Sequence, residues 1–324
     1  MREFDQWNTL PLPDLFRRLS TGGLARRLFE IAHDEDLGVD PLAAAERGGA
    51  PTCSGGDITS NCCIPPERKG VAFMVARGGG TVAGTAAIPM LMDLFAPGCE
   101  YEVRSPDGSR VGAGAIIASL RGPLDELLGL ERTLLNLVGR LSGIATRTAL
   151  HVATLPQGCR AAVYDTRKTT PGLRVLEKYA VRCGGGRCHR MGLHDAVLIK
   201  DNHLAGVGLG ELALFVVQAA NKARRLGRPA FIEVEVDTLD QFQTLLTIPR
   251  GIVDIVLLDN MPPEMLRKAC ALRDAANPAL ELEASGGITL DTLPEIASTG
   301  IDRVSIGGLT HSAVSLDVAL DVEG

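Results

Sequence analysis

The sequence is poor in aromatic residues and carries no excess of positive charge. Phe, Trp and Tyr make up 4% of its 324 residues, and the formal net charge is −6. Few bases could stack on so few rings, and proteins that bind nucleic acid over a broad surface are usually basic. These two features exclude a general nucleic-acid binder, so an anionic ligand would need a local cluster of Lys and Arg.

The sequence also lacks long apolar runs, a recognisable signal peptide and the regular cysteine spacing of a disulfide-rich protein. No stretch is apolar over the length that crosses a bilayer, and MREFDQWNTLPLPDLF has no basic start followed by an apolar segment. The eight cysteines are scattered along the chain. We therefore expect a cytoplasmic protein with reduced thiols.

The first part of the chain predicts a small α+β domain with a largely antiparallel sheet. Residues 14–33 read as a helix interrupted by Gly-Gly, and residues 40–70 as an irregular surface segment. Strands are expected at 71–77, 81–88 and 114–120, with a hairpin around Pro-Asp-Gly at 101–111. An amphipathic helix should follow, because apolar residues recur at spacings of three and four from Leu134 to Ala145.

The rest of the chain repeats one pattern. Six short apolar runs alternate with helical segments at intervals of roughly 22–36 residues, as in repeated βα units: RAAVYDT, DAVLIKD, FIEVEVD, DIVLLDN, LELEASGG and DRVSIGG. Such units build either a parallel β/α barrel or an open parallel sheet. Each run ends in polar residues or glycine, and parallel folds place their sites at that edge. The six ends should form one ring.

Six cations form one candidate set, and three of them, Arg167, Lys168 and Lys200, follow directly on predicted strands. The set is Arg132, Arg167, Lys168, His189, Arg190 and Lys200. Arg suits a carboxylate or phosphate through its planar fork, and Lys acts as a point charge. They could be ordinary solvated surface charges. However, clustered cations repel one another unless an anion joins them, so we favour a polyanionic ligand.

Two glycine-ended strands and two acids complete the pattern. SGGI (285–288) and SIGG (305–308) are either tight turns or a phosphate cradle, which barrels often form at their last two loops. Glu235 and Asp259 could bind sugar hydroxyls, help hold Mg²⁺ or stabilise a developing cation, or could simply pair with the cations.

Two other interpretations explain less of the sequence. Cys183, Cys188 and His189 in CGGGRCHR do not have the spacing of a zinc site. Lys200 could be the Schiff-base lysine of a barrel aldolase, but that leaves the other cations unexplained.

From about residue 70 to its C-terminus the chain resembles the quinolinate phosphoribosyltransferase family. The resemblance rests on DTRKTTPGLRVLEKYAVRCGGGRCHR, VLIKDNH, EVEVDT, VLLDN, ASGGI and SIGGLTHS. TRKTTPG followed by GGGxxHR and IKDNH is a specific combination. The resemblance implies an N-terminal α/β sandwich followed by an incomplete, open parallel β/α barrel. It also implies transfer of phosphoribose from phosphoribosyl pyrophosphate to quinolinate with loss of CO₂, in NAD biosynthesis, with Mg²⁺.

The resemblance also assigns roles to residues. Quinolinate contacts fall on Arg132, Arg167, His189, Arg190 and Lys200, with Arg132 supplied by the neighbouring subunit of a homodimer or larger assembly. Lys168 matches the phosphoribosyl pyrophosphate site, and Glu235 and Asp259 match the acids at the ribose and metal. The 5′-phosphate cradle falls on Ser285, Gly286, Gly287, Gly307 and His311.

The expected domains are residues 1–135 for the sandwich and 136–311 for the barrel, with 312–324 packing back on the first. The segment between EDLG (35–38) and GDITS (56–60) is longer than the family's pattern, which predicts a surface loop. Gly308 stands where alanine is commoner. A paralogous phosphoribosyltransferase for another aromatic acid, or a non-catalytic sensor of sugar phosphates, remains an alternative.

Overall fold

The computed structural model describes residues 6–38 and 56–323, which divide into two compact units. The barrel unit contains the described part of Met1–Thr9 together with Thr148–Thr169 and Gly186–His311. The sandwich unit contains the described parts of Leu10–Arg147, Thr170–Gly185 and Ser312–Gly324. The expected boundary at 135/136 falls inside one long helix, α7 (Leu124–Ala153), which belongs to the sandwich unit as far as Arg147.

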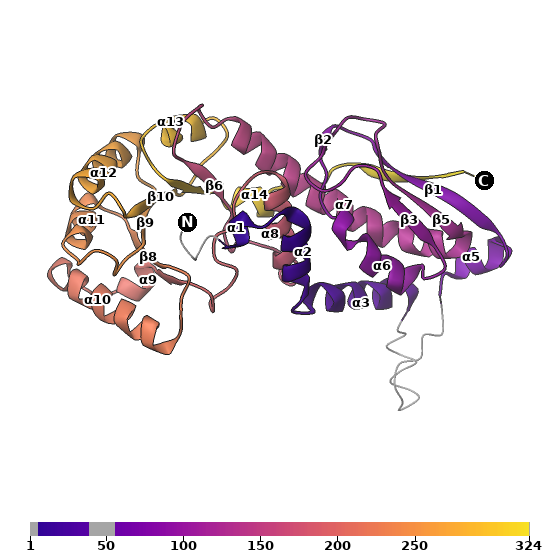
Figure 1. The fold of residues 1–324 in the computed structure, drawn as a ribbon, viewed down its shortest axis with the longest axis horizontal. Coiled ribbons are helices and arrows are strands. Elements are labelled where there is room, and N and C mark those ends of the chain that lie inside the picture. Colours follow the sequence, from indigo (N-terminus) through magenta and orange to yellow (C-terminus); the bar gives the residue numbers. More distant parts are fainter. Residues whose placement is uncertain (1–5, 39–55, 324) are drawn as a thin grey trace. The chain divides into compact units, whose positions relative to one another are not determined.

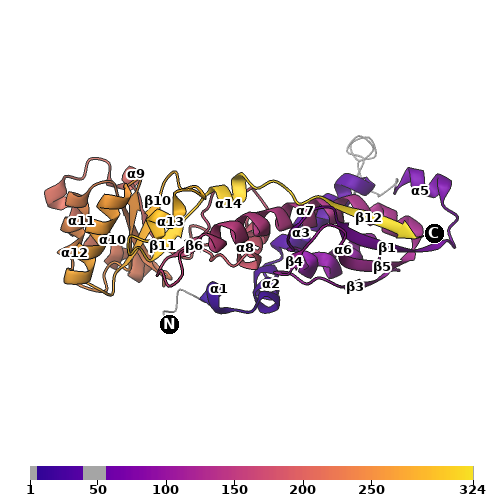
Figure 2. The same ribbon diagram turned by 90° about the horizontal axis from the view of Figure 1, so that it is seen from above.

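An antiparallel sheet with helices on one side forms the sandwich unit. Its strand order is β12-β1-β5-β3, and the C-terminal strand β12 runs along the edge of β1 (Figure 2). The strands are β1 (Lys69–Ala76), β3 (Glu100–Val103), β5 (Ile116–Pro123) and β12 (Val318–Glu323), with β2 (Gly80–Thr81) and β4 (Arg110–Val111) forming a separate pair. The helices are α2 (Leu12–Ser20), α3 (Leu24–Leu37), α5 (Ile58–Cys63), α6 (Ile88–Phe95), α7 and α8 (Arg174–Cys183).

Some local predictions for this unit are confirmed. The helical segment is interrupted at Gly22-Gly23, the strands at 71–77 and 114–120 exist, and the apolar stripe of α7 is buried from Leu134 to Ala145. The segment at 40–70 is not wholly irregular, because α5 begins after Asp57, whose carboxylate accepts hydrogen bonds from the Thr59 and Ser60 amides. The expected loop at 39–55 lies outside the described residues.

Two predictions around residue 81 are wrong. The strand at 81–88 ends at Thr81, and the chain turns into η2 (Thr85–Ala87) and α6 after Gly84, whose φ is +107°. The expected hairpin is absent because β3 pairs with β5, whereas β4 pairs with β2. Asp107, in the turn between them, explains both outcomes: its carboxylate accepts from Thr85 N at 2.8 Å and Ala86 N at 3.1 Å. A contact between distant segments therefore overrides the local hairpin signal.

A six-stranded parallel sheet forms the barrel unit. Its order is β6-β11-β10-β9-β8-β7, and helices α10, α11 and α12 cover its outer side (Figure 1). The strands are β6 (Ala162–Tyr164), β7 (Val197–Ile199), β8 (Ile232–Val236), β9 (Ile255–Asp259), β10 (Glu281–Ser285) and β11 (Arg303–Ser305). The helices are α1 (Gln6–Thr9), α9 (Asp201–Leu204), α10 (Leu209–Leu226), α11 (Leu239–Leu246), α12 (Pro263–Ala276), α13 (Leu293–Ala297) and α14 (Gly308–His311).

The barrel is incomplete, as predicted. β6 and β7 are the two ends of the strand order, and no ladder joins them within the described ranges. Only a parallel bridge between Tyr164 and Arg187 continues the sheet beyond β6. Both faces of the sheet are covered: all five residues of β8 are buried, its two glutamates included, as are four of the five in β9. All six strands predicted from apolar runs are present.

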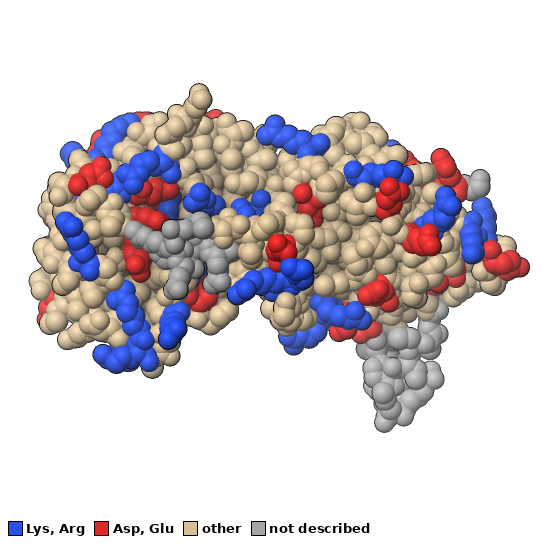
Figure 3. Space-filling model, in the orientation of Figure 1, with Lys and Arg blue, Asp and Glu red and all other residues tan. Residues whose placement is uncertain are grey.

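Three general features complete the description. No helix within residues 6–38 and 56–323 is long and apolar enough to cross a membrane. The seven cysteines in these ranges form no disulfide. Basic and acidic side chains are interspersed on the face drawn in Figure 3, without one continuous basic area.

Candidate active site

A cavity of about 820 Å³ lies at the carboxyl ends of the barrel strands. Pockets of this size are typical of small-molecule sites. Its wall combines cations, acids, glycine-rich loops and a few apolar side chains. The lining residues are Thr166, Arg167, Lys168, His189, Arg190, Leu198, Lys200, Glu235, Leu257, Asp259, Asn260, Glu283, Ser285–Thr289, Ser305–Gly308 and His311.

The segment after β6 is held by its neighbours on both sides. Asp165 is fully buried, and its carboxylate accepts from the His189 amide at 2.8 Å. The Asp165 amide in turn donates to the Arg187 carbonyl at 3.0 Å. Further along, the Lys168 carbonyl accepts from Thr310 Oγ1 at 2.7 Å. These bonds join the DTRK segment to the CHR segment and to the last loop, which explains why their cations share one cavity.

Arg167 and Arg190 face the cavity without acidic partners. Within the described residues neither forms an ion pair, and Arg167 Nε is buried without a hydrogen bond. Burial lowers the pKa of Arg190, and the nearby charge of Arg167 lowers it further. The charges of Glu233 and Asp195 offset this only in part, so a carboxylate or phosphate between the two guanidinium groups would stabilise both.

Lys200, Glu235 and Asp259 form the opposite part of the wall. Lys200 Nζ is ion-paired with Glu235, whose side chain is nearly buried at the end of β8. Burial raises the pKa of Asp259, and the charge of Glu235 raises it further, so the two acids are close enough to repel. Asn260 Nδ2 donates to Asp259 Oδ2 at 2.7 Å, which orients that carboxylate.

The two glycine loops approach other groups closely. A Cβ built on Gly286 would lie 2.0 Å from Asn260 Oδ1, and both residues have positive φ, +97° and +53°. The backbone N–H of Asn260 also donates to the Ser285 carbonyl at 2.9 Å, so the loop after β9 is bonded directly to the loop after β10. A Cβ on Gly307 would lie 2.8 Å from Lys168 Cδ. Glycine is therefore required at 286 for backbone conformation and space.

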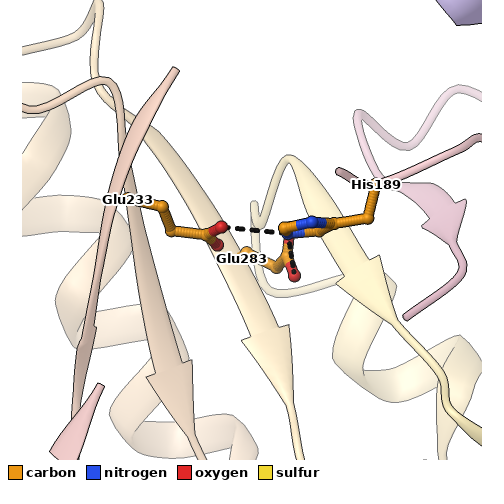
Figure 4. A group of neighbouring side chains, drawn as sticks. All are labelled: His189, Glu233 and Glu283. Carbon is orange, nitrogen blue, oxygen red and sulfur yellow. Dashed lines mark ion pairs between the residues drawn. The ribbon is translucent and has the colours of Figure 1, made fainter. Parts of the chain in front are cut away.

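Two groups of side chains could in principle hold a metal. Glu235 and Asp259 offer carboxylate oxygens to the cavity, as Mg²⁺ requires. His189, Glu233 and Glu283 are buried, and their nitrogen and oxygen atoms all lie within 4.8 Å of one another. The second group is already paired internally, because His189 Nε2 is 2.9 Å from Glu233 and 3.4 Å from Glu283 (Figure 4).

The structure brings together all the predicted site residues except Arg132. These are Arg167, Lys168, His189, Arg190, Lys200, Glu235, Asp259, Ser285, Gly286, Gly287, Gly307 and His311. Arg132 lies on α7 in the sandwich unit, with its side chain 67% exposed. It lines a surface groove of about 450 Å³ with residues of 315–318. The roles of these residues as ligands stay predictions.

Sequence reasoning missed Asn260, Glu233 and Glu283. Asn260 follows directly on a buried strand, where a residue that tolerates positive φ is a signal for a tight, polar turn. Glu233 and Glu283 lie inside apolar runs, in IEVEV and LELEA, and both are fully buried. Acids are almost never buried without a partner, so their presence within apolar strands was the available signal.

Comparison with family models gives two matches that together span most of the chain. Residues 57–142 match the model described as "Quinolinate phosphoribosyl transferase, N-terminal domain", and residues 144–321 match "Quinolinate phosphoribosyl transferase, C-terminal domain". The chain belongs to the quinolinate phosphoribosyltransferase family.

Similar proteins and structures agree with this assignment. The chain is 43% identical over 268 residues to a Bacillus subtilis protein named "Probable nicotinate-nucleotide pyrophosphorylase [carboxylating]", covering 82% of this chain and 88% of that one. It is 40% identical over 253 residues to a rat protein named "Nicotinate-nucleotide pyrophosphorylase [carboxylating]", covering 77% and 80%. The structure of the nicotinate-nucleotide pyrophosphorylase from Francisella tularensis matches with a TM-score of 0.79 at 31% identity, covering 98% and 99%.

Proposed function

We propose that the chain transfers the phosphoribosyl group of phosphoribosyl pyrophosphate to quinolinate, giving nicotinate mononucleotide, pyrophosphate and CO₂. This is the activity of its family, and its place is de novo NAD biosynthesis. One observation carries the proposal for this chain: among the described residues, the neighbouring cations Arg167 and Arg190 form no ion pair, and the rest of their cavity carries glycine loops and two carboxylates. A dianionic ring and a phosphorylated sugar suit these two regions.

Quinolinate would occupy the cationic part of the cavity. Arg167 and Arg190 offer planar forks to its two carboxylates, and Lys200 adds a point charge. Leu198 and Leu257 supply apolar contact for the pyridine ring. Adjacent carboxylates on one ring are what two adjacent guanidinium groups recognise.

Phosphoribosyl pyrophosphate would occupy the part lined by the glycine loops. Backbone amides of Gly286, Gly287 and Gly307, with Ser285 and His311, would bind the 5′-phosphate. Lys168 would bind the pyrophosphate. The Thr310 hydroxyl donates a hydrogen bond to the Lys168 backbone carbonyl and so fixes the position of that residue. Glu235 and Asp259 would face the ribose.

The reaction follows from these positions. Breaking the bond between ribose C1 and pyrophosphate leaves an oxocarbenium-like sugar, which the fixed carboxylates of Glu235 and Asp259 stabilise. The pyridine nitrogen then bonds to C1. The ring nitrogen becomes positive and stabilises the electron pair left on the adjacent ring carbon when its carboxylate departs as CO₂, and that carbon then takes a proton from water. The protein contributes orientation and electrostatics and needs no covalent nucleophile.

Glu235 and Asp259 fit Mg²⁺ brought in by the substrate. Both offer oxygen ligands, and their repulsion, seen in the raised pKa of Asp259, would be relieved by a cation between them. When bound, Mg²⁺ would neutralise charge on the pyrophosphate as it leaves. Lys200 already pairs with Glu235, so the acid is held in place before substrate binds.

We further propose that the protein is a homodimer or larger assembly in which Arg132 completes the site of a partner subunit. The support is its 67% exposed side chain in a surface groove of the sandwich unit. A cytoplasmic location stays a prediction. The aldolase alternative is less suited to the geometry, because Lys200 is ion-paired with Glu235 and an ammonium in an ion pair has no lone pair with which to attack a carbonyl.

The proposal is tested by product analysis. The purified protein is incubated with phosphoribosyl pyrophosphate and Mg²⁺, with either quinolinate or nicotinic acid, and nicotinate mononucleotide is followed by chromatography. We expect product from quinolinate alone. Arg167→Ala should abolish it, whereas Arg160→Ala, at the other end of β6 and paired with Asp302, should not. No product from quinolinate, with sugar-phosphate binding intact, would favour a paralogue acting on another acid.

A further inference from the structure

Two acids are buried behind the cationic wall of the cavity. Glu233 on β8 and Glu283 on β10 are both fully buried and point toward the imidazole of His189 (Figure 4). His189 Nε2 lies 2.9 Å from Glu233 Oε2 and 3.4 Å from Glu283 Oε1. Two acids from separate strands thus converge on one ring nitrogen, which is more than core packing requires.

Among Glu233, Glu283, Arg303 and His189, the charges balance when His189 is protonated. Arg303 Nε donates to Glu283 at 2.7 Å, and its guanidinium stacks 3.9 Å from the Tyr164 ring. Within 4 Å, and among the described residues, only His189 can offer a counter-charge to Glu233. Because an unpaired buried carboxylate is costly, a neutral imidazole would leave one negative charge without compensation. Two acids with Arg303 and a cationic His189 are neutral together.

The electrostatics of the ring agree with this balance. Burial lowers the pKa of His189, but the charges of Glu283 and Glu233 outweigh it and raise the pKa to about 9. Burial likewise raises the pKa of Glu283, and the charges of His189 and Arg303 outweigh it and lower the pKa to about 2. Two further charged groups lie nearby and carry opposite charges: Arg190, which Glu233 stabilises, and the buried Asp165, whose carboxylate accepts from the His189 amide.

The other ring nitrogen indicates what this cation is for. His189 Nδ1 lies 2.8 Å from the Arg190 amide nitrogen, a contact that by itself suits a lone pair on Nδ1. A protonated ring gives up this hydrogen bond, a cost that the attraction of Glu233 and Glu283 for the imidazolium must outweigh. With a proton on Nδ1, two N–H groups lie side by side and repel. An anionic oxygen that accepts from both would remove that repulsion.

We propose that Glu233 and Glu283 are positioning residues that hold His189 as an imidazolium in the cavity wall, where it binds one carboxylate of the pyridine dicarboxylate together with Arg190. This rests on the proposed function for the identity of the ligand, but the state of His189 in the free protein does not depend on it. The same three groups do not suit a divalent metal, which would add charge to a balanced cluster beside Arg303.

Glu233→Gln is the sharpest variant, because it removes the charge facing His189 and leaves the Glu283–Arg303 pair intact. Glu281→Gln is the matched control: Glu281 lies on β10, 3.6 Å from Arg303 and partly exposed, and makes no ion pair with His189 within the described residues. Glu233→Asp keeps the charge. For each protein, nitrogen-15 spectra of labelled histidine would give the protonation of His189, with His189→Gln identifying its signals, and calorimetry would give the affinities for quinolinate and phosphoribosyl pyrophosphate.

We expect both His189 nitrogens to be protonated at neutral pH in the wild type and Glu281→Gln. In Glu233→Gln, His189 should titrate at lower pH than in the wild type. This variant should also bind quinolinate about tenfold more weakly, which is the lower end of the effect seen when the carboxylate behind a metal-ligating histidine is removed. Phosphoribosyl pyrophosphate binding should be unchanged, and Glu233→Asp should partly restore quinolinate affinity.

Three results would overturn the proposal. They are a neutral His189 at neutral pH in the wild type, unchanged quinolinate affinity in Glu233→Gln, or a stoichiometric metal at His189 in the purified protein. If Glu233→Gln does not fold, the wild-type spectra and Glu233→Asp still decide it. If the wild type binds no quinolinate at all, the proposed function fails. The nitrogen-15 spectra would then still show whether Glu233 and Glu283 hold His189 in its protonated form.

Discussion

Comparing alanine substitutions at Gly286 and Gly287 isolates the energetic effect of the close approach between Gly286 and Asn260. Both have positive φ, +97° and +62°, so alanine is strained at either position. They differ in space: a Cβ on Gly287 meets nothing within 4 Å, whereas one on Gly286 would lie 2.0 Å from Asn260 Oδ1. The side-chain amide of Asn260 would have to move, and the hydrogen bond from its Nδ2 to the Asp259 carboxylate would be lost.

The expected difference follows from these contacts. The left-handed backbone costs an L residue roughly 1–2 kcal/mol, and both alanine variants share that cost. A hydrogen bond to a charged group contributes about 1.5–3 kcal/mol, and we take the lower end because Asn260 is exposed. Gly286→Ala should therefore be less stable than Gly287→Ala by about 1.5 kcal/mol.

Denaturant unfolding of the two ligand-free variants measures this difference. In activity, Gly286→Ala should also lower kcat/KM for phosphoribosyl pyrophosphate by about tenfold, because Asp259 loses the group that orients it. Asn260→Gly, which relieves the positive φ but removes the amide, should lower activity without a comparable loss of stability. Equal stabilities of the two alanine variants would refute the reasoning, since the clash with Asn260 would then have no energetic consequence.

Three further predictions concern the cations. Arg167→Ala should abolish quinolinate binding while leaving phosphoribosyl pyrophosphate binding largely intact; equal loss of both in calorimetry would contradict the assignment. Arg132→Ala mixed with Arg190→Ala should recover part of the activity if subunits share sites, and no recovery in proven heterodimers would place each site in one chain. Because the pKa of His189 is raised from 6.5 to about 9, its stabilising contribution should be complete below pH 6.5 and lost as pH rises through 9. Unfolding free energies of wild type and His189→Gln should converge over that range, and a constant difference would argue against a charged His189.

The barrel could be predicted from the sequence because its signals are local. Each strand is a short apolar run covered on both faces, and each ends in the polar residues that line the cavity, as at Lys200, Glu235 and Asp259. The carboxyl ends of parallel strands meet at one edge, so the ring of site residues follows from the pattern alone.

What could not be predicted depends on contacts between distant segments. The Pro-Asp-Gly turn at 106–108 is a good hairpin signal, but Asp107 instead binds the amides of Thr85 and Ala86, and the flanking strands join different sheets. Similarly, the acids of IEVEV and LELEA indicate that buried partners exist, but only the fold shows that Glu233 and Glu283 lie against His189. Local patterns contain no information about such partners.

The central claim is that one chain joins phosphoribose to a pyridine dicarboxylate and releases the carboxyl group next to the ring nitrogen. The most direct test uses quinolinate carrying carbon-13 in that carboxyl group. We predict labelled CO₂ only when phosphoribosyl pyrophosphate is present, in equal amounts with pyrophosphate and nicotinate mononucleotide. Release of labelled CO₂ without phosphoribosyl pyrophosphate, or formation of a mononucleotide only from nicotinic acid, would contradict the account.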